Sequence, residues 1–401
     1  MGRPKKIKEK IKKLAQPIQH ISGMHDVLPQ DWKWWDFCLE KFTRLAKAYG
    51  FQRIETPILE KTDLFSRSVG EATDIVEKEM FSFQDKGGEN LTLRPEGTAP
   101  IARAYIEHGM HSLPQPQKLY CIGPMFRYSR PQAGRYRQFH YLGLEVLGGS
   151  SAILDAQIIF LSWKYLLDIG LKDLEIRINS IGCRECRAQY KEMLKDYYIL
   201  KQRMLCEDCK RRLKINPLRL LDCKQRQCQT LAQGAPQIID YLCEECHDHF
   251  KSVLEFLDEC EVPYTLDPRL VRGLDYYTKT AFEIWPKFHE AQEAVPLALA
   301  GGGRYDELVE LLGGKPTPSV GVAFGVERII SLIQEQKIEL PSKAPEVFLA
   351  QLGELAKKKS IKIFDKLLTE GIRTQEALSK DSLKSQLALA DKLKVDLTLI
   401  L

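Results

Sequence analysis

Four arginines fall in one short loop between two stretches that are expected to form β-strands. Residues 119–127 are apolar and residues 139–147 alternate, and both are rich in β-prone residues. The arginines are Arg127, Arg130, Arg135 and Arg137. Arg127 ends the first strand and Glu145 lies on the returning one, where a charge is costly without a partner. A guanidinium and a carboxylate on adjacent strands suit a zwitterionic or phosphorylated ligand. The alternative is a solvated basic turn.

Eight of the 11 cysteines form four close pairs within residues 183–246. The pairs are Cys183/Cys186, Cys206/Cys209, Cys223/Cys228 and Cys243/Cys246. A Cys-x2-Cys pair places two thiolates on one tetrahedral metal, so the spacing predicts one or two four-thiolate sites. Structural zinc is favoured over an iron–sulfur cluster, and free thiols are the alternative. Because two of the pairs lie at expected helix starts, we expect Cys206/Cys209 to share a metal with Cys243/Cys246.

A third candidate stretch, Arg94–Thr98, ends one expected strand and opens a helix. Glu96 at this junction either caps the helix or holds an ammonium group, and the residues alone do not separate the two roles. The hydroxyl of Thr98 lies beside it for the same ligand.

Further along the chain, after the paired cysteines, Arg272 and Gly273 precede Tyr276 and Tyr277. A cation beside hydroxyl donors suits an anionic transition state and a polar substrate, although a half-buried aromatic ladder on a strand is slightly favoured. Residues 301–303 are all glycine, which either lets a backbone approach a ligand closely or ends a strand.

The last candidate, Arg328, falls in the first turn of an expected helix. A cation is disfavoured there unless it serves an anion, so a phosphate contact is the preferred interpretation.

These residues need a scaffold of mixed type. The pattern predicts a helix at about 30–49 and a strand at 51–60 that Pro57 interrupts, as at a sheet edge or subunit interface. Residues 183–262 read as a helical, cysteine-rich insertion. From residue 346 strands and helices alternate as β-α-β-α-β, the start of an α/β domain.

Composition limits the class of protein. The chain has 401 residues, is 44% apolar and has a net charge of +5, which permits two or three domains and a polyanionic partner. Residues 1–18 form a basic extension. We find no apolar run of membrane-spanning length and no signal peptide. In a chain that resembles a cytosolic protein in this way, disulfides are not expected, and metal ligation is the preferred interpretation of the cysteines.

Several of these stretches match known motifs. FQRIETPILE (51–60) resembles motif 1 of the class II aminoacyl-tRNA synthetases, FRYSRPQAGRYRQFH with LEVLG resembles motif 2, and FGVER resembles motif 3. RGLDYYTKTAFE and AGGGRYDELVELLGG resemble the two signatures specific to histidine, and RPEGT resembles an amino-acid-binding strand end. Over residues 19–401 the chain therefore resembles the histidyl-tRNA synthetase family.

The resemblance implies an α+β fold. Residues 19–341 would form a class II catalytic domain, an antiparallel sheet flanked by helices, with residues 183–262 inserted in it. Residues 346–401 would form a partial α/β anticodon-binding domain. The implied activity is that of a ligase that converts L-histidine and ATP, with Mg²⁺, to histidyl-adenylate and transfers histidine to tRNA(His). The implied assembly is a cytoplasmic homodimer.

The resemblance also implies roles for single residues. The catalytic residues would be Arg127, Arg272 and Arg328, and ATP would be bound by Arg127, Arg135 and Arg328. Histidine would be bound by Glu96, Gly97, Thr98, Arg127, Tyr141, Glu145, Arg272, Tyr276, Tyr277 and Tyr305.

Three departures from the family pattern support an alternative. Ser129 stands where the family has a glutamate that reads adenine, and Tyr141 stands where it has a glutamine. The C-terminal domain is expected to be incomplete. The alternative is a non-catalytic, synthetase-like regulatory subunit of ATP phosphoribosyltransferase. RPEGT, Arg272, the loop arginines and the cysteine-rich insertion favour the synthetase.

Overall fold

The computed structural model describes residues 18–70, 73–287, 297–341 and 345–401. All but the last residue of the basic extension expected at 1–18 lies outside these ranges. The chain divides into two units, Met1–Ile338 and Glu339–Leu401.

The first unit is built on an eight-stranded sheet with the order β1-β5-β6-β11-β10-β9-β7-β8. The strands are β1 (Gln52–Arg53), β5 (Gln117–Phe126), β6 (Gln138–Leu147), β7 (Leu174–Ser180), β8 (Thr265–Leu266), β9 (Thr278–Pro286), β10 (Ala300–Arg304) and β11 (Ser319–Gly325). Only the outer pairs β1–β5 and β7–β8 are parallel. The long hairpin β5–β6 is the one that the arginine-rich loop predicted.

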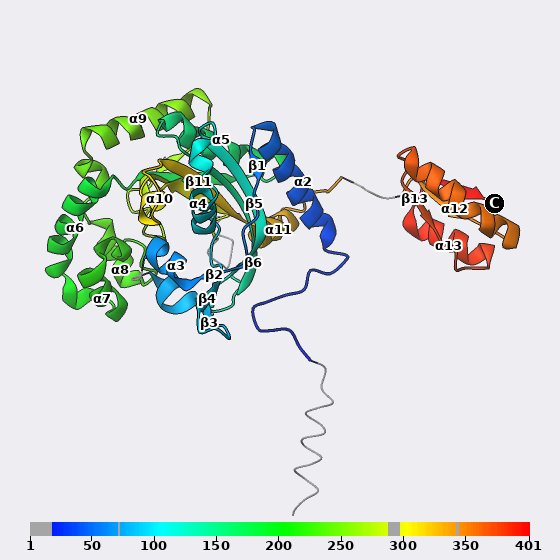
Figure 1. The fold of residues 1–401 in the computed structure, drawn as a ribbon, viewed down its shortest axis with the longest axis horizontal. Helices are drawn as coiled ribbons and strands as arrows, with labels where there is room; N and C mark the ends of the chain where they lie inside the picture. Colours follow the sequence, from blue (N-terminus) through cyan, green and yellow to red (C-terminus); the bar gives the residue numbers. More distant parts are fainter. Residues whose placement is uncertain (1–17, 71–72, 288–296, 342–344) are drawn as a thin grey trace, which may run out of the picture. The chain divides into compact units, whose positions relative to one another are not determined.

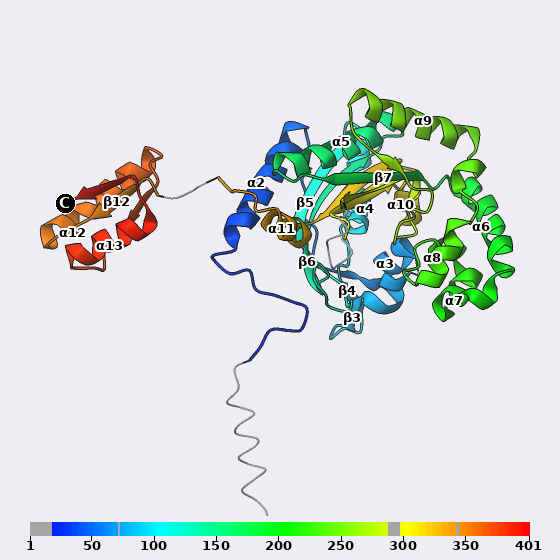
Figure 2. The same cartoon turned by 180° about the vertical axis from the view of Figure 1, so that it is seen from behind.

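Helices α2 (Trp32–Ala48), α5 (Ala152–Asp168), α9 (Glu244–Glu259) and α11 (Val326–Glu335) pack around this sheet (Figures 1 and 2). The ring of Phe42 on α2 lies 5.4 Å from Tyr165 and 5.9 Å from Phe324, so the first helix buries its aromatic face against α5 and the sheet. Asp155 of α5 forms a fully buried ion pair with Arg304 of β10, which fixes that helix to the central strands.

A smaller sheet, β2-β4-β3, adjoins the first. It consists of β2 (Leu59–Lys61), β3 (Phe81–Gln84) and β4 (Asn90–Leu93), with α3 (Thr62–Val69), the π-helical turn η1 (Ile75–Glu79), α4 (Thr98–Glu107) and α10 (Leu308–Leu311) beside it. The single strand expected at 51–60 is wrong: β1 and β2 belong to different sheets. Pro57 lies between them, where its missing N–H group interrupts no hydrogen bonds between strands.

The cysteine-rich insertion is helical, as expected. It contains α6 (Arg184–Ile199), α7 (Glu207–Ile215), α8 (Arg226–Gln233) and α9, with the short 3₁₀ turns η3 (Gln202–Met204), η4 (Pro217–Leu220) and η5 (Ile238–Tyr241). A further 3₁₀ turn, η2 (Met110–Ser112), precedes β5. Both views place α7 and α8 beside α3.

The second unit is a three-stranded parallel sheet in the order β13-β12-β14. Its elements are β12 (Val347–Ala350), α12 (Glu354–Thr369), β13 (Thr374–Glu376), α13 (Leu383–Leu393) and β14 (Leu397–Ile400), the alternation that the tail predicted. Across the described residues of both units, we find no helix that combines the length and the apolarity needed to cross a bilayer.

Candidate active site

One end of the site is built around the carboxylate of Glu145 on β6, which is 1% exposed. Its Oε1 accepts hydrogen bonds from the hydroxyls of Thr98 (2.8 Å) and Tyr141 (3.0 Å), and its Oε2 accepts one from Tyr305. Burial raises the pKa of Glu145 to about 7 against the opposing effect of these bonds. Gly321 faces it on β11, where any Cβ would overlap the carboxylate.

A second buried carboxylate, Glu96, lies beside the first. It accepts hydrogen bonds from the backbone N–H groups of Thr98 (2.7 Å) and Ala99 (2.9 Å), so it caps α4, which is one of the two roles that the sequence left open. It also accepts the hydroxyl of Tyr276 at 3.2 Å, and burial raises its pKa. One residue on, Gly97 is the N-cap of α4 and lies against the ring of Tyr141.

The aromatic residues close this end. The ring of Tyr276 lies 4.8 Å from that of Tyr277 and 5.8 Å from that of Tyr305. All three are buried, and they come from segments nearly 30 residues apart. Tyr276 and Tyr277 lie in the loop before β9, not on a strand, so the preferred reading of an aromatic ladder is wrong. The acidic end therefore presents two carboxylates within a wall of hydroxyls and rings.

The opposite end of the site is cationic and contains Arg127, Arg135 and Arg328. Within the described chain none of the three forms an ion pair with a carboxylate. Arg328 lies in the first turn of α11, as predicted, and donates to the carbonyls of Gly134 (2.9 Å) and Ala298 (2.7 Å). Burial, and then repulsion from Arg127 and Arg135, lower the pKa of Arg328 to about 10. Burial also lowers the pKa of Arg127.

The segment 95–98 joins the two ends. Arg127 donates to the carbonyl of Pro95 at 2.8 Å, and Thr98 bonds Glu145. The strand register pairs Glu145 with Leu119, eight residues before Arg127, so the predicted guanidinium and carboxylate share a site without pairing. Arg137 serves the loop instead, because it stacks on Tyr128 at 4.0 Å and donates to the carbonyl of Ser22.

Arg272 lies between the two ends and is held in place on three sides. Its guanidinium pairs with Glu283 of β9 and lies 5.1 Å from the ring centre of Tyr277. A Cβ at Gly301 would stand 2.5 Å from its Nη1, so the glycine run makes room for this arginine. Its buried Nε has no hydrogen-bond partner among the described residues.

Sequence reasoning missed two acidic residues here. Glu283 interrupts the apolar run Ala281–Trp285, the same signal that singled out Glu145. Glu327 accepts hydrogen bonds from the backbone N–H of His140 at 2.8 and 3.0 Å and contacts its ring Nδ1 at 2.9 Å. That contact ties α11 to β6, and with them Arg328 to the acidic strand.

The eight paired cysteines form two separate tetrads. Cys183, Cys186, Cys243 and Cys246 form the root tetrad, and Cys206, Cys209, Cys223 and Cys228 form the inner tetrad. Within each tetrad all Sγ atoms lie within 4.8 Å of one another. The Sγ atoms of Cys183 and Cys186 are 3.6 Å apart, and those of Cys206 and Cys223 are 3.8 Å apart. Tetrahedral zinc with bonds of about 2.3 Å separates its sulfurs by about 3.8 Å, so both tetrads fit zinc.

The predicted pairing of Cys206/Cys209 with Cys243/Cys246 is wrong. Both pairs do begin helices, but Cys183 is also a helix N-cap, so this signal did not discriminate between partners. The chain leaves the sheet at Cys183 and returns through Cys246. The first and last pairs therefore meet at the root of the insertion, and the middle pairs close a loop inside it.

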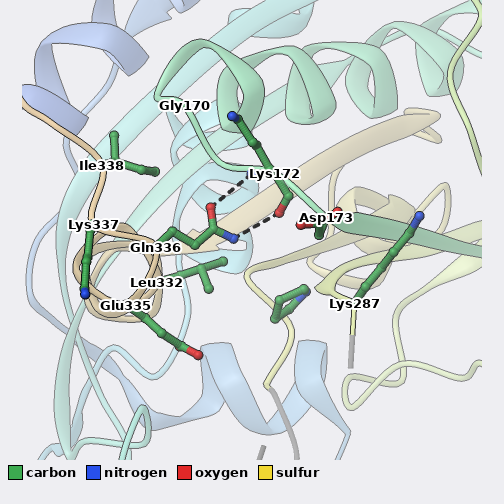
Figure 3. Close-up of a pocket in the computed structure, with 10 residues that line it drawn as sticks. Gly170, Lys172, Asp173, Lys287, Leu332, Glu335, Gln336, Lys337 and Ile338 are labelled. Carbon is green, nitrogen blue, oxygen red and sulfur yellow. Dashed lines mark hydrogen bonds between the residues drawn. The ribbon is translucent and has the colours of Figure 1, made fainter. Parts of the chain in front are cut away.

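A pocket between the start of β7 and the end of α11 lies apart from this site (Figure 3). The side-chain amide of Gln336 bonds both the N–H and the carbonyl of Lys172 at 3.1 Å there. No candidate catalytic or binding residue lines it.

The antiparallel sheet, with an arginine after its long hairpin strand and another opening the helix after its last strand, defines a class II aminoacyl-tRNA synthetase catalytic domain. The family model for histidyl-tRNA synthetase matches residues 23–329. The chain therefore belongs to the histidyl-tRNA synthetase family.

Similar proteins agree with this assignment. Histidine–tRNA ligases of Dehalococcoides mccartyi and Caldicellulosiruptor saccharolyticus are each 49% identical, over 384 and 387 residues, covering 96% of this chain and 91% of theirs. The crystal structure of apo S. aureus histidyl-tRNA synthetase matches with a TM-score of 0.80 and 36% identity over 96% of this chain and 91% of that one. A Bacillus halodurans structure described as an ATP phosphoribosyltransferase regulatory subunit/histidyl-tRNA synthetase is 22% identical with a TM-score of 0.67, a likeness of fold alone.

Proposed function

We propose that this protein is a histidine–tRNA ligase, which forms histidyl-adenylate from L-histidine and ATP and transfers the histidyl group to tRNA(His). The observation that carries the proposal is the division of the site into an acidic, hydroxyl-lined end and an end with three arginines that form no ion pair with a carboxylate among the described residues. Such a site is complementary to an amino acid joined to a polyphosphate.

Histidine occupies the acidic end in this proposal. Glu96 and Thr98 receive its ammonium group, and Tyr141 shapes the same region beside Gly97. The carboxylate of Glu145 accepts a hydrogen bond from the imidazole, with Tyr276, Tyr277 and Tyr305 around the ring. The hydroxyls that now bond the two carboxylates hold them in place for the ligand.

ATP occupies the cationic end, where Arg135 and Arg328 hold its outer phosphates and Arg127 its α-phosphate. A carboxylate oxygen of histidine attacks the α-phosphorus, the bond to the bridging oxygen breaks, and diphosphate leaves. Arg127 and Arg272 face the charge that grows on the α-phosphate, so positioning and neutralisation supply most of the rate. A ribose hydroxyl at the tRNA 3′ end then attacks the histidyl carbonyl carbon and releases AMP.

Magnesium is expected as a counterion of the ATP phosphates. Glu283 and Glu327, near the arginines, are engaged by Arg272 and His140. The groups of three or more potential ligands found in the described chain are the two cysteine tetrads. These residues do not fit a protein-held Mg²⁺, and we assign it no protein ligand.

Zinc is proposed for both tetrads as a structural ion. The eight cysteines form no disulfide in the described chain, and four-thiolate sites with this spacing hold zinc in a closed, non-catalytic geometry. The use of cysteines as metal ligands also fits a reducing, cytoplasmic location.

A homodimer is proposed from the segment that resembles motif 1. Ile58 and Leu59, next to Pro57, are 44% and 41% exposed, which is costly for apolar side chains at a sheet edge unless a partner covers them. Sedimentation velocity at micromolar concentration tests this state.

Histidine-dependent exchange of diphosphate into ATP tests the activity without tRNA. Exchange that falls steeply in Arg272→Ala, to a residual rate that can still be measured, supports the ligase, and charging of tRNA(His) then tests the second step. A folded protein that binds histidine without exchange would instead favour the regulatory subunit. The relatives at 49% identity carry the ligase name and argue against that alternative.

A further inference from the structure

Side chains of the cysteine-rich insertion form hydrogen bonds with the loop that carries Arg272, Tyr276 and Tyr277. Arg219 of η4, which is 8% exposed, donates from Nη2 to the carbonyl of Gly273 at 2.8 Å. The side chain of Asn216 donates to Asp275 at 3.2 Å. From α6, Arg187 donates to the carbonyl of Tyr277 at 2.9 Å.

This loop depends on such contacts because it has no regular secondary structure. Side chains of the insertion thus hold the main chain immediately after Arg272 and at Tyr277. An arginine that meets a developing charge must be placed to within a fraction of an ångström, and about 1 Å of error costs roughly 100-fold in rate.

The same insertion also reaches the support of the arginine-rich loop. Arg211 and Arg212 of α7 pair with Glu77 (2.8 Å) and Asp74 (2.7 Å), on and before η1. The carbonyl of Glu79 at the end of η1 accepts the N–H of Tyr128 at 2.7 Å. Exposed ion pairs contribute little to the free energy of unfolding. We therefore expect these two pairs to act mainly by positioning η1 relative to α7.

The helices that bear these side chains are too short to be stable in isolation. Helix α7 has nine residues, η4 four and α8 eight, which is below the length at which isolated helices persist. The inner tetrad closes this segment: Cys206 caps α7, Cys209 lies in its first turn, Cys223 follows η4 and Cys228 lies on α8. A metal held by the four thiolates would fix Arg219 relative to α7.

We infer that the inner tetrad, with its metal bound, positions the loop that carries Arg272. Arg219 is the positioning residue, because it connects the tetrad segment to the main chain next to Arg272. The inference rests on the proposed function. It gives the insertion a role in adenylate formation, before any tRNA is bound.

The test is diphosphate exchange by the full-length, zinc-loaded protein with Arg219→Met. The expected result is a fall in kcat of roughly 10- to 100-fold with zinc content and melting temperature kept, and partial rescue by Arg219→Lys. Arg203→Met, an exposed arginine of the same insertion, is the matched control and keeps the parent rate.

A double-mutant cycle separates positioning from general damage. Because Arg219 acts through Arg272, Arg219→Met is expected to cause no further loss in an Arg272→Ala background. Cys228→Ser is expected to remove one zinc per chain and reproduce the loss in kcat. An unchanged rate in Arg219→Met, or a full further loss in the Arg272→Ala background, would overturn the inference. Failure of the unmutated protein to catalyse exchange would overturn the proposed function itself.

Discussion

The charges at the acidic and cationic ends of the site are compensated in opposite ways. Glu145 and Glu96 are surrounded by hydroxyl and backbone donors, so each carboxylate is hydrogen-bonded before any substrate arrives. Arg127, Arg135 and Arg328 lie near one another and form no ion pair with a carboxylate of the described residues, and repulsion adds to burial in lowering the pKa of Arg328. The acidic end is thus completed by the protein, whereas in the proposed function the cationic end is completed by the phosphates of ATP.

The strongest way to break this comparison is to remove a charge from the cationic end with Arg328→Gln. We expect diphosphate exchange to fall by roughly 100- to 1,000-fold, because a phosphate-facing charge is lost. The melting temperature is expected to stay the same or rise, since repulsion with Arg127 and Arg135 is relieved. Kinetics and differential scanning calorimetry measure the two effects, and a large loss of stability would show that Arg328 is structural.

At the acidic end, too, a charge that the proposed function needs lowers the stability of the fold, and here the size of the effect depends on pH. The pKa of Glu145 rises from 4.5 to about 7 in the fold, so the fold favours its protonated form. That contribution is complete below pH 4.5 and is lost as the pH rises through 7. Glu145→Gln, which does not titrate, is therefore expected to gain stability over the parent by up to about 3 kcal/mol between these limits, while losing affinity for histidine.

Urea unfolding at pH 5.5 and pH 8 measures this difference. The exposed Glu259→Gln serves as the control, because its stability is expected to follow that of the parent at both pH values. A gain for Glu145→Gln that is equal at the two pH values would contradict the assigned pKa.

A smaller effect is expected where the two ends meet. Gly301→Ala would place a Cβ against the guanidinium of Arg272 and displace it. We expect exchange to fall by roughly 10- to 100-fold. Since the change acts through Arg272, the double variant with Arg272→Ala is expected to be no slower than Arg272→Ala alone. Additive losses would show that the glycine supports the sheet and not the arginine.

Local patterns predicted most of the elements and the chemistry of the site, but not the partners of distant segments. The hairpin β5–β6 and the position of Arg328 follow from neighbouring residues, and the structure has both where expected. The cysteine partners do not, because several pairs begin helices and only the path of the insertion decides which meet. Glu283 was overlooked although it interrupts an apolar strand as Glu145 does, since its partner Arg272 precedes it in an irregular loop.

The smallest expected effect concerns Tyr141, one of the two residues that depart from the family pattern. Its hydroxyl donates to Glu145 at 3.0 Å as one of three such donors, so Tyr141→Phe weakens the acidic end without opening it. We expect the KM for histidine to rise by roughly 3- to 10-fold, which corresponds to the loss of one ordinary hydrogen bond. Tyr49→Phe, outside the site, is the control.

The pH dependence of this variant sharpens the comparison between the two ends. Loss of a donor raises the pKa of Glu145 further, because one bond that favours the carboxylate is gone. The ionised form that receives the imidazole then becomes scarcer as the pH falls, so the increase in KM for histidine is expected to be larger at pH 6 than at pH 8. The KM for ATP is expected to stay unchanged at both. A parallel rise in the two KM values would mean that the ends are not independent, and that Tyr141 holds the segment 95–98 that joins them.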